Sequence, residues 1–557
     1  MEGIVVLLFF LILFVILVCK GILEKKRTIE KWKKTFEEEH GKINKRQLKT
    51  EELERISHYC KEKKTESYID ELTWNDLDMD LVYEQIAYTK SSLGDDYLYY
   101  LLRNPVKEEW ILENREKKVT VLAKHPQLRI RLQVIFAQIG RIRDYSLADY
   151  MKYLMQEEPR SNVKHYLADG CIVASVFLMG MDVGLGWIIF FGLILYNIVV
   201  YFKDKAYLEP YLVSLRYLFK IKEHAKELLK ELPGEWEEEK KQLQEILMSM
   251  KKVEKNSFLV MSPGRLGGEG MELVLDYLRM CLHLDIIKFN RMLLQIQKYE
   301  KELWTLYQIM GETDACIAVT EYRASLQEVT CPIFQKEDAV FAEEVYHPLL
   351  VSPVSNSLEM KKNVLLTGSN ASGKSTFLKT LGINILLAQT IHTCTARSFK
   401  MPFCSVYTSM SLKDSLTLKE SYYMAEIKAI KRILDAAKKG EQIVCMVDEV
   451  LRGTNTIERI AASTQILKAM AGKNIMCLAA THDMELTKTL AKEYDNYHLE
   501  ESLVKGDVLF SYKLKKGRSQ SSNAIDLLAN LGYDNELIED ARNMVAYFEE
   551  KGEWICV

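Results

Sequence analysis

A glycine-rich stretch at residues 367–376, TGSNASGKST, has the residue types and the spacing that bind a polyphosphate. It matches the pattern G-x-x-x-x-G-K-[ST] at all of its fixed positions. Glycines let the backbone curl so that consecutive N–H groups point inward at oxygen atoms. The lysine brings a positive charge to the terminal phosphates, and the serine hydroxyl that follows can ligate Mg²⁺. The pattern therefore predicts nucleotide contacts from Gly368, Ser369, Asn370, Ala371, Ser372, Gly373, Lys374, Ser375 and Thr376.

Two adjacent acidic residues follow a short apolar run further along the chain. The run at residues 443–447 is typical of a buried strand and ends in Asp448 and Glu449. An acid at the carboxyl end of a parallel strand lies in the crevice where α/β sheets bind ligands. We expect Asp448 to hold Mg²⁺ together with Ser375. We expect Glu449 to orient or deprotonate the attacking water.

A histidine follows a third apolar run. Residues 475–480 predict another strand, which ends in Thr481 and His482. A lone histidine is more often structural, but the position of this one at a strand end favours a functional role. His482 is therefore a candidate to contact the γ-phosphate or the attacking water.

These side chains must be positioned by alternating strands and helices. Residues 364–366 predict a buried strand that leads into the glycine-rich loop, and residues 377–387 predict a helix that starts at its end. With the two later strands, this pattern predicts an α/β P-loop ATPase domain at residues 340–557, with ATP and Mg²⁺ as its ligands.

The preceding part of the chain is predicted to be helical. Apolar residues recur at three- and four-residue intervals within residues 70–165, and residues 204–339 have mixed charge and few prolines. Long helices are expected at residues 235–252 and 293–310. We therefore expect an all-α core and lever region in two parts, 70–165 and 204–339.

The first residues predict a membrane anchor at 1–22. The chain is uncharged and almost wholly apolar from Gly3 to Cys19, about the shortest length of helix that spans a hydrocarbon core. Glu2 precedes this run and several lysines follow it, which favours an uncleaved anchor over a signal peptide and leaves the downstream chain in the cytoplasm. Residues 23–69 are highly charged and predict a solvated juxtamembrane helix.

A second apolar stretch runs from Gly170 to Phe202, with Asp182 as its one charge. It could form one crossing, a hairpin that turns near Asp182 and crosses twice, or a buried hairpin of a soluble domain. ATP is cytoplasmic, so two crossings are needed to keep the ATPase domain there after the first anchor. We therefore predict a transmembrane hairpin at 166–203 and a multi-pass protein of the cell membrane with a cytoplasmic ATPase domain.

Length, charge and cysteine content limit the alternatives. A chain of 557 residues exceeds one ordinary core, so about three structural units are expected. The formal net charge is −3, with 75 basic and 78 acidic residues, so any contact with nucleic acid must depend on local patches. The 11 cysteines form no C-x-x-C motif, which favours reduced thiols in a cytoplasmic compartment.

Taken together, the motifs resemble the MutS family of DNA mismatch repair ATPases, whose domain belongs to the ABC-type clan. The resemblance is carried by TGSNASGKST (367–376), VDEVLRGTNT (447–456) and AATHDMEL (479–486), with supporting stretches at 346–350, 409–427 and 512–544. Residues 91–105 and 299–327 look like parts of the family's helical core and lever. The chain has no stretch like the family's N-terminal mismatch-reading domain and carries the predicted membrane anchor in its place.

The resemblance implies a homodimer in which each ATP is shared by two subunits. Ser421 matches the serine that the family presents to the partner's ATP, and the C-terminal residues match its dimerisation helices. DNA binding is implied by the resemblance alone. Two other functions stay open: an ATP-switched membrane scaffold that does not act on DNA, and an ABC-like transport ATPase.

Overall fold

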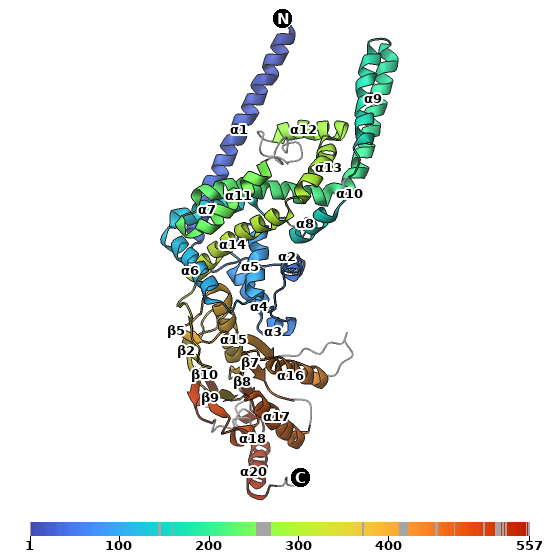
Figure 1. Ribbon diagram of the computed structural model, residues 1–557. Coiled ribbons are helices and arrows are strands. Elements are labelled where there is room, and N and C mark those ends of the chain that lie inside the picture. Colours follow the sequence, from blue (N-terminus) through green and yellow to red (C-terminus); the bar gives the residue numbers. More distant parts are fainter. Residues whose placement is uncertain are drawn as a thin grey trace. The chain divides into compact units, whose positions relative to one another are not determined.

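The computed structural model describes residues 2–142, 146–158, 160–251, 269–369, 372–410, 422–451, 455–472, 474–504, 507–518 and 532–552, with 525, 528, 529 and 554. Two compact units share this chain, and each combines separate stretches (Figure 1). The helical unit consists of Met1–Lys64, Ile86–Tyr100 and Glu116–Ser325. The nucleotide unit consists of Thr65–Gln85, Leu101–Arg115 and Leu326–Val557. Residues 65–85 and 101–115 therefore group with the nucleotide unit, although most of them were expected in the helical core.

The helical unit is built from long helices. They are α1 (Glu2–Glu39), α2 (Thr50–Glu62), most of α5 (Ser92–Arg103), the second half of α6 (Glu109–Lys124), α7 (Pro126–Ile139), α8 (Leu147–Gln156), α9 (Val163–Met179), α10 (Val183–Glu231), α11 (Glu237–Ser249), α12 (Glu269–Leu282), α13 (Leu284–Gln297) and α14 (Glu300–Ser325).

The charged helix predicted over residues 23–69 is divided in the structure. Its first part continues α1 without a break to Glu39, and Gly41 then takes a left-handed conformation with φ of 74°. Only glycine adopts such a conformation at no steric cost, so the helix stops there. The chain up to α2 is held by Arg46, whose guanidinium lies 2.6 Å from Asp95.

The long helix predicted over residues 293–310 is also divided. α13 ends at Gln297 and α14 begins at Glu300. The side chain of Gln297 donates to the carbonyl oxygens of Leu154 and Glu157, at 3.1 and 2.8 Å, which fixes the end of α13 against α8. The helix predicted over residues 235–252 begins with a 3₁₀ turn, Gly234–Trp236, and continues as α11.

Helices α9 and α10 form the hairpin that was predicted to turn near Asp182. The side chain of Asp182 caps α10 by accepting a bond from the Leu185 N–H at 3.0 Å. Large apolar side chains along both helices are exposed, Phe177 by 75% and Ile188 by 73%. Among the described residues, one helical stretch, Val183–Glu209, is long and apolar enough to cross a membrane, and 11% of its most apolar part is buried. Most side chains of the predicted anchor at residues 1–22 lie outside the described part of the chain.

Two glycines allow α5 and α14 to cross closely. A Cβ atom on Gly311 would lie 2.8 Å from both the Leu93 carbonyl oxygen and the Tyr97 Cβ. A Cβ atom on Gly94 would lie 2.1 Å from Asp314 Oδ2. Because both contacts involve buried groups, the two helices can pack this closely only with glycine at each position.

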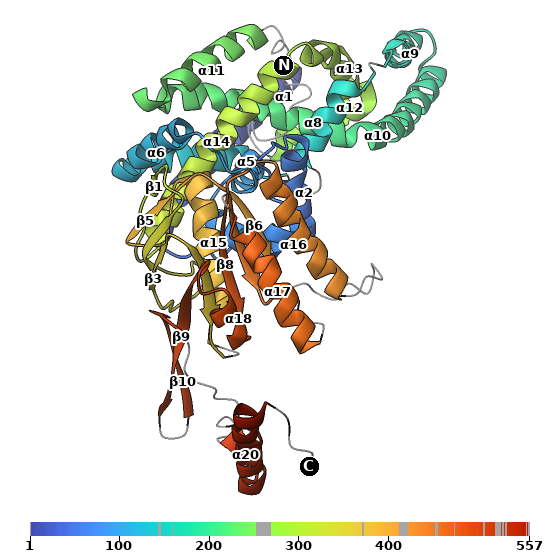
Figure 2. The same ribbon diagram turned by 60° about the horizontal axis from the view of Figure 1, so that its bottom comes forward.

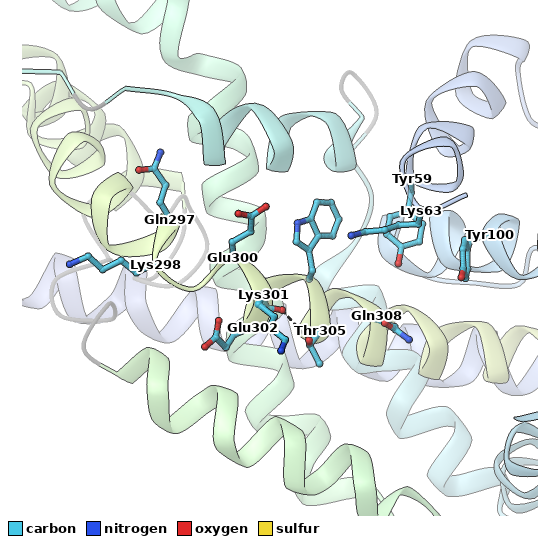
Figure 3. A pocket seen from close by; sticks show the side chains of 11 residues that line it. Tyr59, Lys63, Tyr100, Gln297, Lys298, Glu300, Lys301, Glu302, Thr305 and Gln308 are labelled. Carbon is cyan, nitrogen blue, oxygen red and sulfur yellow. Dashed lines mark hydrogen bonds between the residues drawn. The ribbon is translucent and has the colours of Figure 1, made fainter. Parts of the chain in front are cut away.

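An open pocket of about 580 Å³ lies between α2, α5 and α14 of the helical unit (Figure 3). The ammonium group of Lys63 lies 4.5 Å above the ring of Trp304, and the ring of Tyr59 stacks on Tyr307. These contacts attach the end of α2 to α14.

The nucleotide unit contains two sheets. The larger has the order β10-β9-β4-β8-β7-β6, in which β9 and β10 are antiparallel and the other pairs are parallel. Its strands are β4 (Asn363–Thr367), β6 (Ser405–Ser409), β7 (Ile443–Asp448), β8 (Ile475–Thr481), β9 (Tyr494–Val504) and β10 (Asp507–Lys516). The smaller, of order β1-β5-β2-β3, comprises β1 (Ile333–Phe334), β2 (Val340–Val345), β3 (Asn356–Met360) and β5 (Ser398–Met401).

Helices cover both faces of the larger sheet (Figure 2). α15 (Lys374–Ile391) packs on one face, and α16 (Tyr422–Lys438) and α17 (Thr456–Met470) pack on the other. β4, β7 and β8 are buried at every position, as expected for central strands with helices on both faces. The predicted strands and the predicted helix after the glycine-rich loop are confirmed. The remaining helices are α3 (Glu71–Asp76), α4 (Met79–Ile86), α18 (Met484–Thr489) and α20 (Asn535–Lys551).

Candidate nucleotide-binding site

The glycine-rich loop follows β4 and leads directly into α15. Gly368 and Gly373 have φ angles of 151° and 98°, a region that favours glycine. A Cβ atom at Gly368 would lie 2.7 Å from the Ser372 hydroxyl, and one at Gly373 would lie 3.1 Å from the ring of Tyr512. Both glycines are therefore required by conformation and by space. Asn370 and Ala371, two of the predicted loop contacts, lie outside the described residues.

The side chain of Lys374 is folded over this loop. Its ammonium group donates to the carbonyl oxygens of Gly368 and Ser369, at 2.9 and 2.8 Å, and the residue is 5% exposed. A buried ammonium group at the N-terminus of an apolar helix attracts anions strongly, because the helix dipole and the charge act together. The hydroxyl of Ser372 is also buried beside it, with no hydrogen-bond partner among the described residues.

Ser375, the residue after Lys374, pairs with Asp448 to form an oxygen-rich group. The Ser375 hydroxyl donates to Asp448 Oδ2 at 2.5 Å. Asp448 is 8% exposed, and its Oδ1 atom is buried with no hydrogen-bond partner among the described residues. A buried carboxylate oxygen without a donor is costly unless a cation binds it. A hydroxyl and a carboxylate are the oxygen ligands that Mg²⁺ prefers, so these residues fit that ion.

Glu449 and His482 meet beside this pair. The Nε2 atom of His482 lies 2.7 Å from Glu449 Oε1 and 3.3 Å from the Lys374 ammonium. A carboxylate only accepts hydrogen bonds, so the Nε2 proton points toward Glu449. The contact with Lys374 is then a close approach of two donors, an arrangement that an anion placed between them would stabilise.

The backbone at Glu449 is strained. Its φ is 56°, a left-handed conformation that costs a non-glycine residue on the order of 1–2 kcal/mol. The Glu449 N–H donates to the Ala480 carbonyl oxygen at 2.9 Å, which fixes the end of β7 against β8. This bond turns the Glu449 side chain toward the residue that follows β8.

A pocket of about 330 Å³ lies beside the loop. Gly373, Thr376 and Phe377 line it from the loop and α15, and His347 and Tyr512 line it from elsewhere in the unit. His347 and Tyr512 belong to the stretches at 346–350 and 512–544 that support the family resemblance, and Gly373 and Thr376 are predicted nucleotide contacts. Burial lowers the pKa of His347 to about 4, so the ring is neutral at pH 7. Its Nδ1 atom accepts a bond from the Leu349 N–H at 3.3 Å.

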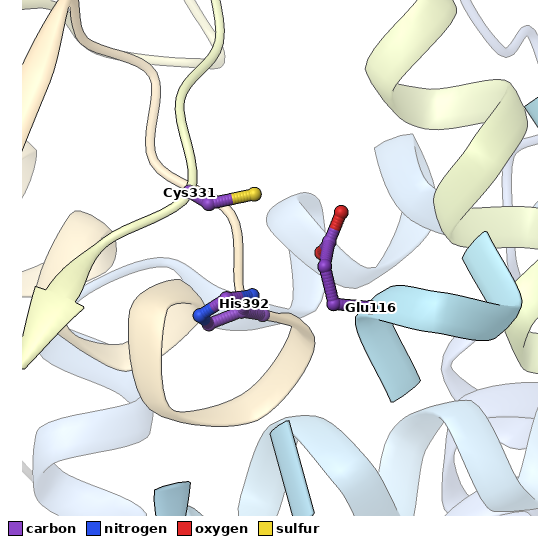
Figure 4. A group of neighbouring side chains, drawn as sticks. All are labelled: Glu116, Cys331 and His392. Atoms are coloured by element: carbon purple, nitrogen blue, oxygen red, sulfur yellow. The ribbon is translucent and has the colours of Figure 1, made fainter. Parts of the chain in front are cut away.

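Cys331 and His392 lie near each other in the nucleotide unit (Figure 4). His392 ends α15 in a left-handed conformation, and its ring stacks on Phe334. Glu116, also drawn in Figure 4, belongs to the helical unit and accepts two bonds from Arg323. These contacts are structural, and we assign no metal ion there.

The structure thus brings together Lys374, Ser375, Asp448, Glu449 and His482 from three segments of the chain. Ser421 lies outside the described residues.

The part of the chain that carries the site is similar to known proteins. Residues 364–549 match the family model described as MutS domain V. A curated relative named Endonuclease MutS2, from Staphylococcus aureus, is 31% identical over 48% of this chain and 38% of its own length. Relatives of the same name from Staphylococcus aureus strains JH9 and Newman are 31% and 30% identical, each over 48% of this chain and 35% of their own length. The matched part therefore spans less than two fifths of these relatives.

Proposed function

We propose that the chain is a MutS-type ATPase that binds and hydrolyses ATP at the site of Lys374, Asp448 and Glu449, supported by the match of residues 364–549 to MutS domain V. One observation carries the proposal. Ser375, next to Lys374 in the chain, bonds to Asp448, and His482, which contacts Lys374, also contacts Glu449. The Oδ1 atom of Asp448 is buried without a hydrogen-bond donor among the described residues. The cluster therefore contains groups that can bind phosphates, groups that can bind a divalent cation, and a carboxylate that can act as a general base.

Each residue of the cluster has a distinct role in this proposal. Lys374 exchanges the carbonyl oxygens of Gly368 and Ser369 for oxygens of the β- and γ-phosphates. Asp448 Oδ1 and the Ser375 hydroxyl would hold Mg²⁺, which when bound neutralises charge on the phosphates. The apolar pocket beside the loop accepts the nucleoside part of ATP.

Glu449 is the proposed general base. It takes a proton from the attacking water, and the bond from His482 holds its carboxylate in place. The Lys374 ammonium lies beside this bond, 3.3 Å from His482 Nε2, and in the proposal it stabilises the charge that moves to the phosphoryl oxygens.

The proposed assembly is a homodimer in which Ser421 of a second copy completes each site. The exposed apolar side chains of α20 support a contact between copies. Leu537 is 48% exposed, and Phe548, which is 38% exposed, stacks on Trp554. ATP can shift such a dimer toward its closed form only to the extent that it binds the closed form more tightly than the open form.

We also propose that the protein is a multi-pass protein of the cell membrane with its nucleotide unit in the cytoplasm. The exposed apolar surface of α9 and α10 supports this location, since such a surface in water would be a strong aggregation site. α1, α9 and α10 would supply three crossings.

DNA is the proposed partner of the closed dimer, in line with the family's part in DNA mismatch repair. The endonuclease activity in the relatives' name is not carried over, because the match covers at most 38% of their length. Filter binding with duplex, mismatched and branched DNA at several salt concentrations tests this partner. A salt-independent, weak signal for every form would favour the ATP-switched scaffold instead.

Nucleotide binding by Lys374→Ala tests the site itself. The variant loses one of the charges that hold the phosphates, and we expect ATP affinity to fall at least tenfold, about the effect of losing one charge-assisted bond. Lys362→Ala is the matched control, because Lys362 is an exposed lysine that precedes β4. Equal affinity of both variants, measured with a fluorescent ATP analogue, would remove Lys374 from the site.

A further inference from the structure

Asp483 uses its side chain in an unexpected way. It follows His482 and stands at the N-cap of α18, where an aspartate normally accepts a bond from a helix N–H. The Asp483 side chain makes no cap bond. Its two carboxylate oxygens instead accept bonds from Arg459, at 2.7 Å from Nη2 and 3.1 Å from Nε. Such two-point bonding between arginine and a carboxylate is the strongest and most directional kind of ion pair.

Arg459 is also in an unusual position. It lies in the first turn of α17, where the helix dipole disfavours a cation. The bond to Asp483 raises the pKa of Arg459, and the charges of Glu449 and Glu485 act in the same direction. The two side chains are 24% and 18% exposed, so water screens the pair less than it screens a surface ion pair.

The pair connects the two segments that carry the proposed catalytic side chains. α17 follows the segment with Glu449, and Asp483 is the residue directly after His482. The Asp483 N–H donates to the Thr481 hydroxyl at 3.0 Å, which fixes the turn at the end of β8. The His482–Glu449 bond and the Arg459–Asp483 bonds are therefore two links between the same two segments.

We propose that the Arg459–Asp483 pair is a positioning device for ATP hydrolysis. It holds the turn after β8 so that the His482 ring stays against Glu449 and beside Lys374. Neither residue is placed in contact with the nucleotide, so the pair acts on the chemical step and not on ATP binding. This inference rests on the proposed function.

The test is steady-state ATP hydrolysis by the full, detergent-solubilised chain. Asp483→Asn keeps the size of the side chain but removes its charge, and Arg459→Gln removes the other partner. We expect each to lower kcat about tenfold, a coupling typical of residues in one polar network, with KM for ATP unchanged. The double variant should be no slower than either single variant, and the reversed pair, Arg459→Asp with Asp483→Arg, should recover part of kcat. Asp435→Asn is the control, since Asp435 pairs with Lys438 on the exposed face of α16.

Different outcomes overturn different claims. If Asp483→Asn retains the kcat of the unsubstituted chain, or if the two single effects multiply in the double variant, the pair has no positioning role. A rise in KM that accounts for the whole loss of kcat/KM would also overturn it. If the unsubstituted chain hydrolyses no ATP, the proposed function fails, and the role of the pair fails with it.

Discussion

Asp448 illustrates how a single residue reveals a binding site. One of its oxygens accepts a bond from Ser375, and the other is buried without a donor among the described residues. A protein rarely keeps such an atom in its core, because desolvation is not compensated. The strained backbone at Glu449 also costs stability, and like the buried Asp448 oxygen it lies at the end of β7.

His347 should make the nucleotide unit sensitive to acid. Burial lowers its pKa from the ordinary value of 6.5 to about 4 in the folded protein. The unfolded chain therefore binds a proton more readily, so the stability from this residue is complete above pH 6.5 and is lost as the pH falls toward 4. The full loss would be about 3 kcal/mol by the usual conversion of a pKa difference.

Thermal unfolding of the wild-type chain and of His347→Gln between pH 7 and pH 4 measures this effect. The unfolding temperature of the wild type should fall more steeply than that of the variant. Parallel curves for the two proteins would show that His347 does not titrate as its burial requires.

At the scale of elements, the crossing of α5 and α14 depends on glycine. Gly311→Ala would place a Cβ atom 2.8 Å from the Leu93 carbonyl oxygen, which is backbone and cannot turn away. We expect the free energy of unfolding of the helical unit to fall by about 1–3 kcal/mol, the usual cost of overpacking. Gly234→Ala, with no atom within 4 Å of the new Cβ, is the control for chemical denaturation. Equal stability of the two variants would contradict the close packing of these helices.

Elements with a strong local signal could be predicted from sequence. β4, β7 and β8 are short apolar runs that end in polar residues, and the loop before α15 has fixed positions in a known pattern. Their side chains converge because parallel strands end at one edge of the sheet. The sequence alone therefore predicts the five residues that the structure brings together in the candidate site.

Other features had no local signal. The break after Gln297 depends on a partner far along the chain, the carbonyl oxygen of Leu154. The pocket around His347 and the Arg459–Asp483 pair are assembled by tertiary contacts, and the spacing of these residues in the sequence has no pattern. The grouping of residues 65–85 with the nucleotide unit likewise depends on contacts such as the fully buried Leu77 against Gly382.

At the scale of the whole molecule, the proposed three crossings make a prediction about topology. In sealed right-side-out vesicles, residues 204–557 should be protected from added protease, and in inverted vesicles they should be cleaved. This expectation follows from the lysines after the apolar run at Gly3–Cys19 and from the proposed double crossing of α9 and α10. Cleavage of the nucleotide unit in right-side-out vesicles would mean that the chain crosses the membrane a different number of times.

The most direct measurement is ATP turnover by the full chain in detergent with Mg²⁺, compared with Glu449→Gln. Loss of the general base should lower kcat by about 10²–10⁴-fold and leave ATP affinity intact, so that the variant retains bound ATP. Glu458→Gln, an exposed glutamate of α17, should hydrolyse ATP as the wild type does. Equal turnover by Glu449→Gln and the wild type would show that hydrolysis does not occur at the end of β7, and the central claim would be wrong.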